Sequence, residues 1–209
     1  MIKLENYEVS GWDHAIRGAR NPMNSWHRMD SGFEICSPGR CEGFYLGPND
    51  HKLLMRLAKA GSDHRKWMRM VTVYVDITAP LYWWKEFDTY KVGTVANSCS
   101  TMHKIHAKEF ELADFSHDHL LDRPVSVLRD VISVLNQYRD LYLADKDKIW
   151  WQQMIQLLPS SYNQKRTVML NYEVLRNIYH ARKNHKLEEW HEFCDWIEKL
   201  PYSEFITEK

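Results

Sequence analysis

Three polar side chains near the C-terminal end of the sequence have a spacing that could hold an extended, charged ligand. Asn171, Asn177 and Arg182 follow one another in the segment from Leu158 to Arg182, which we interpret as a loop leading into an amphipathic helix. On such a helix Asn171 and Arg182, eleven residues apart, would share one face about 16 Å apart, because eleven steps of about 100° return to nearly the same angle. The alternative interpretation is a core helix with ordinary surface polar residues.

The other reactive side chains do not form a recognised catalytic or metal-binding pattern. Among the eleven His residues, His103 with His106 and His117 with His119 come closest to a metal site, but neither pair has further ligands at a standard spacing. We therefore expect no structural metal. No His with Asp stands at a triad spacing to Ser100, so we do not expect this serine to be a nucleophile.

Composition excludes several classes of protein. The sequence has 209 residues, which suits a single domain over residues 1–209 with a sizeable core. Its 28 Lys and Arg residues balance 28 Asp and Glu residues, so no bulk attraction to nucleic acid or to a membrane is implied. We expect a cytoplasmic protein, because the sequence contains no apolar run of about 18 residues and no signal-peptide core. Its four cysteines are expected to be free thiols: Cys36, Cys41, Cys99 and Cys194.

Hydrophobic periodicity predicts an α+β fold, with a mixed or antiparallel sheet flanked by helix clusters. Alternation of β-branched residues over 71–77 gives the clearest strand, and residues 3–10 alternate more weakly. A long loop is expected over residues 21–48, where Gly, Pro, Ser and Asn are frequent. An irregular segment is expected over residues 92–100. Besides the C-terminal Asn/Arg helix, helices are expected over residues 13–20, 49–61, 81–90, 122–143, 149–157 and 186–199.

Several segments, taken in chain order, resemble the motifs of the flavin-dependent thymidylate synthases. The C-terminal signature of that family is Leu-Pro, then two Asn residues and an Arg at the spacing found here. The matching segments are Ala15–Arg20, His64, the strand over 71–77 with Ala79-Pro80, the helix that begins at Leu81, Thr94 with Asn97 and Ser100, and Leu158-Pro159 with Asn171, Asn177 and Arg182. The resemblance therefore covers most of the chain, and it implies the fold of that family.

The resemblance also implies a function and a set of site residues. The family transfers a one-carbon unit to C5 of dUMP, with FAD as hydride carrier and NADPH and methylenetetrahydrofolate as co-substrates, in a homotetramer with sites at subunit interfaces. The cation at the pyrimidine ring would stabilise negative charge as C5 becomes nucleophilic. The implied residues are Arg182 for the pyrimidine ring and for catalysis, Glu86 and Ser100 for the nucleotide, and His64, Lys91, Asn171 and Asn177 for the flavin.

The sequence departs from the family at its central motif. The Arg-His-Arg triplet that grips FAD is Thr89-Tyr90-Lys91 here, and Ser98 and Met102 stand where that motif has Glu and its last Arg. Thr cannot replace a planar guanidinium at a bidentate contact, which argues against FAD binding in the usual mode. Three classes of function fit these residues: a thymidylate synthase-like enzyme acting on dUMP or a related pyrimidine nucleotide, an enzyme of the same fold with another ligand, and a non-catalytic nucleotide-binding homologue.

Overall fold

The computed structural model describes residues 2–37 and 40–208, and the side chains of residues 2–33 and 43–208. The chain forms two compact units. The first unit comprises Met1–Glu5, Asp76–Thr89 and Ala96–Thr167, and the second comprises Asn6–Val75, Tyr90–Val95 and Val168–Lys209. Each unit is described separately below, and a single domain over residues 1–209 stays a prediction.

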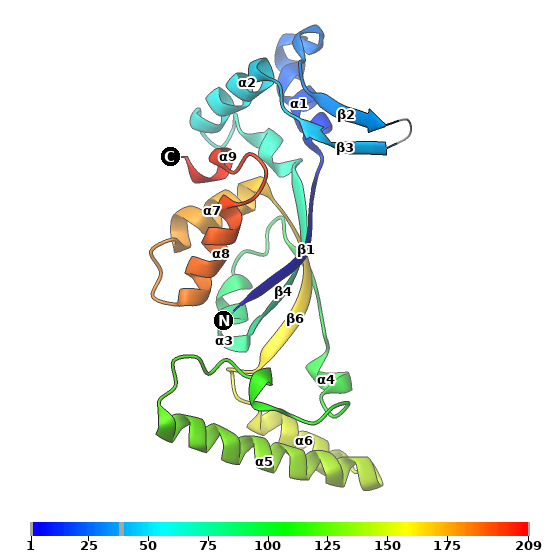
Figure 1. Cartoon of the computed structure of the whole chain (residues 1–209), viewed down its shortest axis with the longest axis vertical. Helices are drawn as coiled ribbons and strands as arrows, with labels where there is room; N and C mark the ends of the chain where they lie inside the picture. The colour runs from blue at the N-terminus through cyan, green and yellow to red at the C-terminus, as the bar shows by residue number, and fades with distance from the viewer. Residues whose placement is uncertain (1, 38–39, 209) are drawn as a thin grey trace. The chain divides into compact units, whose positions relative to one another are not determined.

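Strands are interspersed with runs of consecutive helices, such as α4–α6 and α7–α9, which confirms the predicted α+β class (Figure 1). Four strands form one sheet in the order β1-β4-β6-β5, and β2 and β3 form a separate antiparallel hairpin. The strands are β1 (Lys3–Ser10), β2 (Gly32–Ser37), β3 (Arg40–Tyr45), β4 (Thr72–Pro80), β5 (Val95–Ser98) and β6 (Asn163–Asn171). The helices are α1 (Trp12–Arg20), α2 (Pro48–Lys59), α3 (Leu81–Phe87), α4 (Thr101–Lys104), α5 (Asp122–Asp145), α6 (Lys148–Leu157), α7 (Tyr172–Arg182), α8 (Glu188–Glu198) and α9 (Glu204–Thr207).

Three segments that were predicted to be loops or irregular contain strands. The segment after Leu158-Pro159 is not a loop, because Asn163–Asn171 forms β6, in which Gln164, Val168 and Leu170 are buried. Lys165 and Arg166 interrupt the apolar alternation there and hide it from a sequence pattern. Likewise, the expected loop over 21–48 contains the β2–β3 hairpin, and the irregular segment over 92–100 contains β5.

The helix predicted over residues 49–61 is α2, and it starts one residue earlier than expected. The helix begins at Pro48, with Gly47 as the N-cap residue and no capping side chain of its own. The carboxylate of Asp30 accepts hydrogen bonds from the backbone N–H groups of Asn49 and Asp50 at 2.9 and 3.0 Å. A residue twenty positions upstream of Asp50 therefore satisfies the N–H groups that a helix start leaves unpaired.

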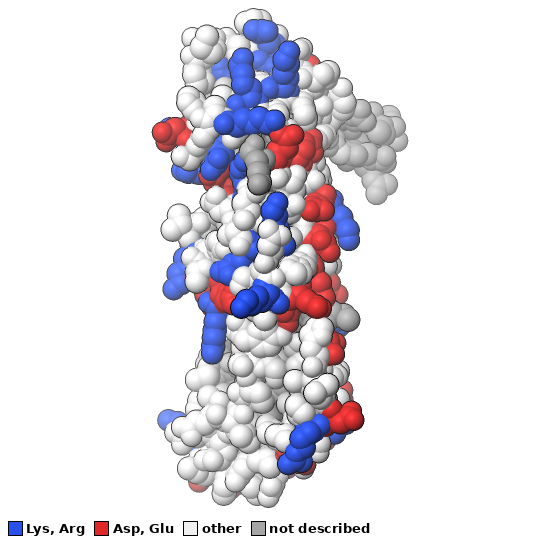
Figure 2. All heavy atoms as spheres, turned by 90° about the vertical axis from the view of Figure 1, so that its left-hand side faces the viewer, with Lys and Arg blue, Asp and Glu red and all other residues white. Residues whose placement is uncertain are grey.

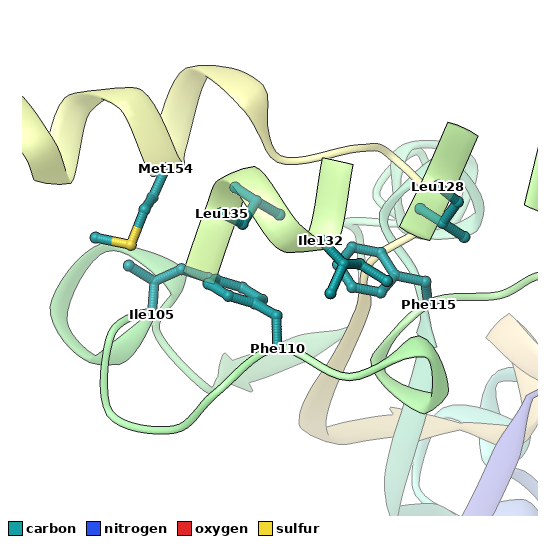
Figure 3. Packing of buried hydrophobic residues seen from close by; sticks show 7 residues of the cluster. All are labelled: Ile105, Phe110, Phe115, Leu128, Ile132, Leu135 and Met154. Carbon is teal, nitrogen blue, oxygen red and sulfur yellow. The ribbon is translucent and has the colours of Figure 1, made fainter. Parts of the chain in front are cut away.

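The core of the first unit fixes the segment that follows α4 (Figure 3). Leu128, Ile132 and Leu135 form the buried stripe of α5 that its i, i+4, i+7 spacing predicts. Met154 on α6 packs against them, and α5 and α6 lie together as an antiparallel pair (Figure 1). The side chains that complete the cluster come from the segment between α4 and α5: Ile105, Phe110 and Phe115.

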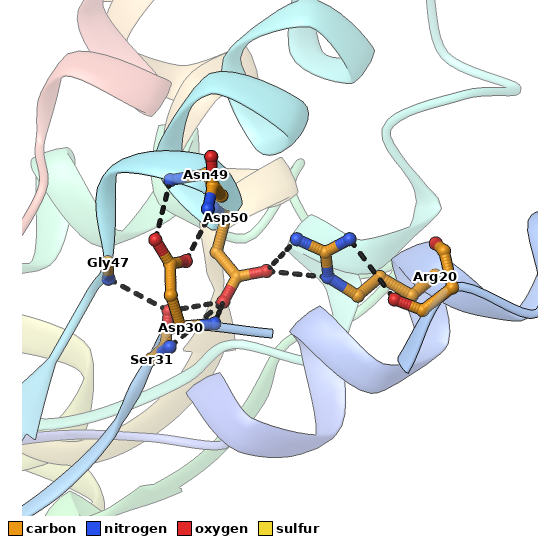
Figure 4. Close-up of polar contacts among 7 residues, drawn as sticks. Arg20, Asp30, Ser31, Gly47, Asn49 and Asp50 are labelled. Atoms are coloured by element: carbon orange, nitrogen blue, oxygen red, sulfur yellow. Dashed lines mark hydrogen bonds and ion pairs between the residues drawn. The ribbon is translucent and has the colours of Figure 1, made fainter. Parts of the chain in front are cut away.

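A buried ion pair holds α1 and α2 of the second unit together (Figure 4). The side chain of Asp50 is fully buried and that of Arg20 is almost so, and Arg20 Nε donates to Asp50 Oδ1 at 2.7 Å. The other carboxylate oxygen accepts from the hydroxyl and the backbone N–H of Ser31, at 2.7 and 3.0 Å, and from Asp30 N at 2.9 Å. Because both oxygens are satisfied, the buried charge is fully paired.

Candidate functional site

Asn171 lies at the junction of β6 and α7 and serves as the N-cap of that helix. Its Oδ1 accepts a hydrogen bond from the backbone N–H of Val174 at 3.0 Å, and the residue is only 9% exposed. Its backbone is extended, with φ −132° and ψ 169°. The prediction that Asn171 and Arg182 share one face of a helix is therefore wrong, since Asn171 precedes the first helical residue.

The segment between α3 and β5 passes directly over Asn171. Gly93 has φ +82°, a conformation that favours glycine, and a Cβ atom there would lie 3.0 Å from Asn171 Nδ2 and 3.1 Å from Val174 Cγ2. The hydroxyl oxygen of the next residue, Thr94, is buried and has no hydrogen-bond partner among the described residues. The close approach places this segment against the first turn of α7.

We expect Gly93→Ala to destabilise the protein more than Gly61→Ala does. Both glycines have positive φ, so alanine is strained at either position by about 1–2 kcal/mol. Nothing lies within 4 Å of a Cβ atom at Gly61, whereas Gly93 faces Asn171, so the crowded site should cost roughly 1 kcal/mol more. Denaturant unfolding of both variants measures the difference, and equal midpoints would contradict the close packing on Asn171.

Arg182, at the end of α7, is held by two aromatic rings. Its Nε donates to the phenol oxygen of Tyr90 at 2.9 Å, and its guanidinium carbon lies 5.0 Å from the ring centroid of Trp190 and 5.7 Å from that of Tyr90. The two rings are themselves in edge contact, with centroids 6.2 Å apart. These contacts hold the guanidinium plane of Arg182 in a defined orientation.

The other predicted flavin residues of the second unit lie at its surface. His64 is exposed in the turn that follows α2, and its neighbour Arg65 pairs with Glu173 in the first turn of α7 at 2.9 Å. Lys91 and Asn177 are also exposed. The segment from Tyr90 to Thr94 thus contacts both ends of α7, through Gly93 at Asn171 and through Tyr90 at Arg182. The Arg65–Glu173 pair connects the turn that contains His64 to the same helix.

Ser100 lines a cavity of about 290 Å³ in the first unit. Two hydrogen bonds place it there: Cys99 N donates to Lys165 O at 2.9 Å, and Gln164 Nε2 donates to Cys99 O at 3.0 Å. The hydroxyl of Ser100 caps the short α4 by accepting from His103 N at 3.0 Å. The lining residues include three lysines and no carboxylate: Cys99, Ser100, Thr101, Lys104, Ile105, Lys108, Phe110, Tyr162, Asn163, Gln164 and Lys165.

The polar groups of this cavity are suited to an anion. Lys108 pairs with Asp114, and Lys165 pairs with Asp76 at 3.1 Å, whereas Lys104 is an exposed cation on α4. Asn163 Oδ1 is buried and lacks a hydrogen-bond partner within the described part of the chain. Burial raises the pKa of the Tyr162 phenol, so that this group stays a neutral donor. Glu86, the other predicted nucleotide residue, lies half-buried on α3 outside the lining of the cavity.

Metal ligands are not grouped in the described residues: no set of three or more His, Cys, Asp and Glu side chains could hold a metal ion there. His117 Nδ1 contacts the backbone oxygen of Phe115 at 2.7 Å. Cys99 is an exposed free thiol and Cys194 a buried one. The thiols of Cys36 and Cys41 lie outside the described side chains. No helix in residues 2–37 and 40–208 is both long and apolar enough to cross a bilayer.

The residues at the central motif do not fit FAD in the mode that the resemblance implies. Thr89 donates its hydroxyl to Glu86 O at 2.7 Å, and the phenol of Tyr90 accepts from Arg182. Lys91 supplies a point charge rather than a planar fork, and the Oδ1 of Asn171 is used as a helix cap. Most of the polar groups that would bind a flavin are thus either replaced or already engaged.

The secondary structure and sheet topology define an α+β protein, and comparison with solved structures identifies its fold. No protein-family model matches the chain, and no curated protein matches it. The crystal structure of the flavin-dependent thymidylate synthase ThyX from Helicobacter pylori, complexed with FAD and dUMP, is 16% identical, with a TM-score of 0.67 over 99% of this chain and 96% of that chain. A UMP/dUMP methylase, PolB from Streptomyces cacaoi, bound with 5-Br UMP, is 13% identical, with a TM-score of 0.61 over 95% of this chain and 87% of that chain. The chain therefore has the fold of the flavin-dependent thymidylate synthases, as its motifs predict.

Sequence patterns missed two parts of the site. Trp190, in the helix predicted over residues 186–199, is buried, and its ring also contacts the guanidinium of Arg182. The sequence shows Tyr90 only as the residue that stands in place of the motif His, and it indicates no hydrogen-bond partner for the phenol. Ninety-two positions separate Tyr90 from Arg182, so no local spacing could have signalled their hydrogen bond.

Proposed function

We propose that the protein is an enzyme that binds a uracil nucleotide and modifies its C5 carbon. The observation that carries the proposal is the cavity beside Ser100, which is lined by Lys104 and by Asn163, whose buried Oδ1 has no hydrogen-bond partner among the described residues. Its volume of about 290 Å³ is near the lower end of small-ligand sites. Two proteins of the same fold, a thymidylate synthase complexed with dUMP and a UMP/dUMP methylase, support this choice of substrate.

Each polar group would have a distinct task. The Ser100 hydroxyl and the Lys104 ammonium would bind the phosphate, because charge-assisted hydrogen bonds to phosphate are strong. Asn163 Oδ1 would accept a hydrogen bond from a ligand O–H or N–H, which would satisfy the buried oxygen. In the second unit, which is considered separately, Arg182 is oriented by Tyr90 and Trp190, and the resemblance assigns it to a pyrimidine ring, where a cation would stabilise the negative charge that develops when C5 becomes nucleophilic.

Two measurements test the proposal. Mass spectrometry of small molecules released from the purified protein should detect a uracil nucleotide, and calorimetry should measure binding of dUMP or UMP. Lys104→Gln should weaken that binding about tenfold, since one charge-assisted contact to phosphate is lost. The matched control Lys66→Gln, which removes an exposed lysine of the second unit, should not. Absence of binding to both nucleotides would overturn the proposal.

The finer part of the proposal concerns the flavin. Following the resemblance, we propose that FAD, NADPH and methylenetetrahydrofolate take part in the reaction. Because Thr89 and Lys91 replace two guanidiniums, we expect weak FAD binding, and Thr89→Arg with Lys91→Arg should tighten it by about tenfold. A flavin titration followed by fluorescence quenching measures this. The double variant Lys52→Arg with Lys66→Arg is the control. If Thr89→Arg with Lys91→Arg leaves the FAD affinity unchanged, residues 89 and 91 do not face the cofactor.

We further propose that the protein assembles as a homotetramer. Three side chains at seven-residue intervals form an exposed apolar stripe on α5: Val127 is 45% exposed, Val134 36% and Leu141 38%. Most of the surface that α5 and α6 contribute to the view in Figure 2 is uncharged. Apolar surface of this kind favours burial between subunits. Light scattering should give four times the 25.0 kDa chain mass, and Val134→Asp should reduce it, whereas Arg129→Asp, at an exposed position on another side of α5, should not. A stable monomer would contradict the assembly.

A further inference from the structure

A second cavity in the first unit has no part in the proposed function. It has a volume of about 320 Å³ and lies where the end of α5, the start of α6 and the turn after α4 meet. Residues 100, 101, 104 and 105 line the cavity beside Ser100, whereas residues 102, 103 and 106 line this one, so the two cavities lie on different faces of the α4 segment. Apart from Met102, the cavity is lined by aromatic and basic side chains: His103, His106, Tyr142, Lys146, Lys148 and Trp151.

The lining of this second cavity is cationic. Lys146 ends α5 in a left-handed conformation with φ +61°, and its ammonium lies 5.3 Å from the ring centroid of Tyr142. Lys148 is the first residue of α6, two positions further on. The carboxylates next to these lysines are engaged elsewhere: Asp145 accepts from the indole N–H of Trp150 and from a backbone N–H, and Asp147 caps α6. No carboxylate lines the cavity.

Several cations lie around the imidazole of His106. Burial lowers the pKa of its imidazole, and the charges of Lys146, Lys104 and Arg139 lower it further. Its Nδ1 is buried and has no hydrogen-bond partner in the described part of the chain, and its ring lies 4.8 Å from that of Tyr142. Cations gathered around this half-buried imidazole repel one another, and a bound anion would relieve that repulsion.

Two aromatic rings in the lining are suited to a flat ligand. The indole N–H of Trp151 donates to the backbone oxygen of Met102 at 3.0 Å, which fixes the orientation of the ring. The ring of Tyr142 is in edge contact with the imidazole of His106 and lies 5.3 Å from the ammonium of Lys146. Rings held by their neighbours offer contact area at a low entropic cost, and they pack well against planar groups.

From these contacts we propose that the second cavity binds a small planar anion, an aromatic ring that carries a phosphate or a carboxylate. The anionic group contacts Lys146 and Lys148, and the ring packs against Trp151 and Tyr142. The cavity volume of about 320 Å³ admits a ligand of mononucleotide size or smaller. Since none of these residues is assigned to the uracil nucleotide, the site stands independently of the proposed function.

Phenyl phosphate is a suitable probe, because it carries both chemical features and no uracil. Calorimetry on the full chain should show that it binds about tenfold more tightly than inorganic phosphate, and that phenol does not bind. The double variant Lys146→Gln with Lys148→Gln should weaken binding by at least about tenfold. The control Lys52→Gln with Lys186→Gln removes two exposed lysines of the second unit and should bind as the unmodified chain does.

A second readout locates the bound anion. In proton NMR titrations, the pKa of His106 should rise when phenyl phosphate is bound, because a nearby anion favours the imidazolium. His106→Gln assigns the resonance. Unchanged affinity in the double lysine variant, or a His106 titration that the ligand does not alter, would overturn the site. Equal affinity for phenyl phosphate and inorganic phosphate would overturn the requirement for a planar ring.

Discussion

Replacing Arg182 with alanine is expected to weaken dUMP binding by roughly thirty- to several-hundredfold, about 2–4 kcal/mol. The guanidinium is the cationic group that we assign to the pyrimidine ring, and Tyr90 and Trp190 hold it in one plane. Arg182→Lys should recover little of the affinity, because a point charge does not reproduce a planar pair of donors. Calorimetry with dUMP on the unmodified chain and on both variants measures the effect.

The contacts of Arg182 also change the expectation for stability. Sequence patterns predict only a cation near the end of a helix, whose removal would leave the melting temperature nearly unchanged. In the structure Arg182 makes a hydrogen bond to Tyr90 and a cation–π contact with Trp190, which together are worth about 1–2 kcal/mol. Because Arg182→Ala removes both contacts, the variant should melt a few degrees lower than the unmodified chain.

Tyr90→Phe separates the two effects, because it removes the hydrogen bond to Arg182 and keeps the ring. It should reduce dUMP affinity by about three- to tenfold, less than Arg182→Ala does, through looser positioning of the guanidinium. If the unmodified chain binds dUMP and Arg182→Ala binds it equally well, Arg182 has only a structural role at the end of α7, and the assignment of the pyrimidine ring to it fails.

Removing the carboxylate of Asp50 should produce the largest loss of stability. Asp50→Ala leaves the nearly buried guanidinium of Arg20 without its partner, and breaking a buried pair in this way costs about 3–5 kcal/mol. For a chain of this length the melting temperature should fall by roughly 6–20 °C. Thermal and urea unfolding measure the change.

A double variant tests whether the cost comes from the unpaired charge. Arg20→Met combined with Asp50→Leu removes both charges, so it should be more stable than Asp50→Ala. Asp30→Ala is a useful contrast, because it removes the cap of α2 and leaves the Arg20–Asp50 pair in place, with an expected cost of about 1 kcal/mol. Equal stability of Asp50→Ala and the unmodified chain would contradict the buried network.

The contribution of Asp50 should also depend on pH. Burial raises the pKa of its carboxyl, but hydrogen bonds from Ser31, the backbone of Asp30 and Arg20, with the charge of Arg20, outweigh burial and leave the pKa below its usual range. A group with a lowered folded-state pKa stabilises the fold above its unfolded pKa of about 3.9, and this contribution is lost as the pH falls through the folded pKa. The stability difference between the unmodified chain and Asp50→Asn should therefore shrink below about pH 4.

Local sequence patterns were sufficient for the regular elements with strong periodicity. The stripe Leu128–Ile132–Leu135 predicted α5, and the alternating β-branched residues over 71–77 predicted β4, because side-chain spacing in a helix or a strand is a property of neighbouring residues. The ordered motifs from Ala15 to Arg182 likewise predicted the fold, since their sequence order is independent of how the chain is packed.

The roles of the site residues depend instead on partners far away in the sequence. Asn171 was placed on a helix by its spacing from Arg182, but the strand before it makes it the cap of α7. Arg182 meets Tyr90 across 92 positions, and Asp30 caps α2 across twenty. Hydrogen bonds and stacking need atoms within a few ångströms of one another, and the path of the chain through the fold, which no local spacing encodes, decides which distant side chains come that close.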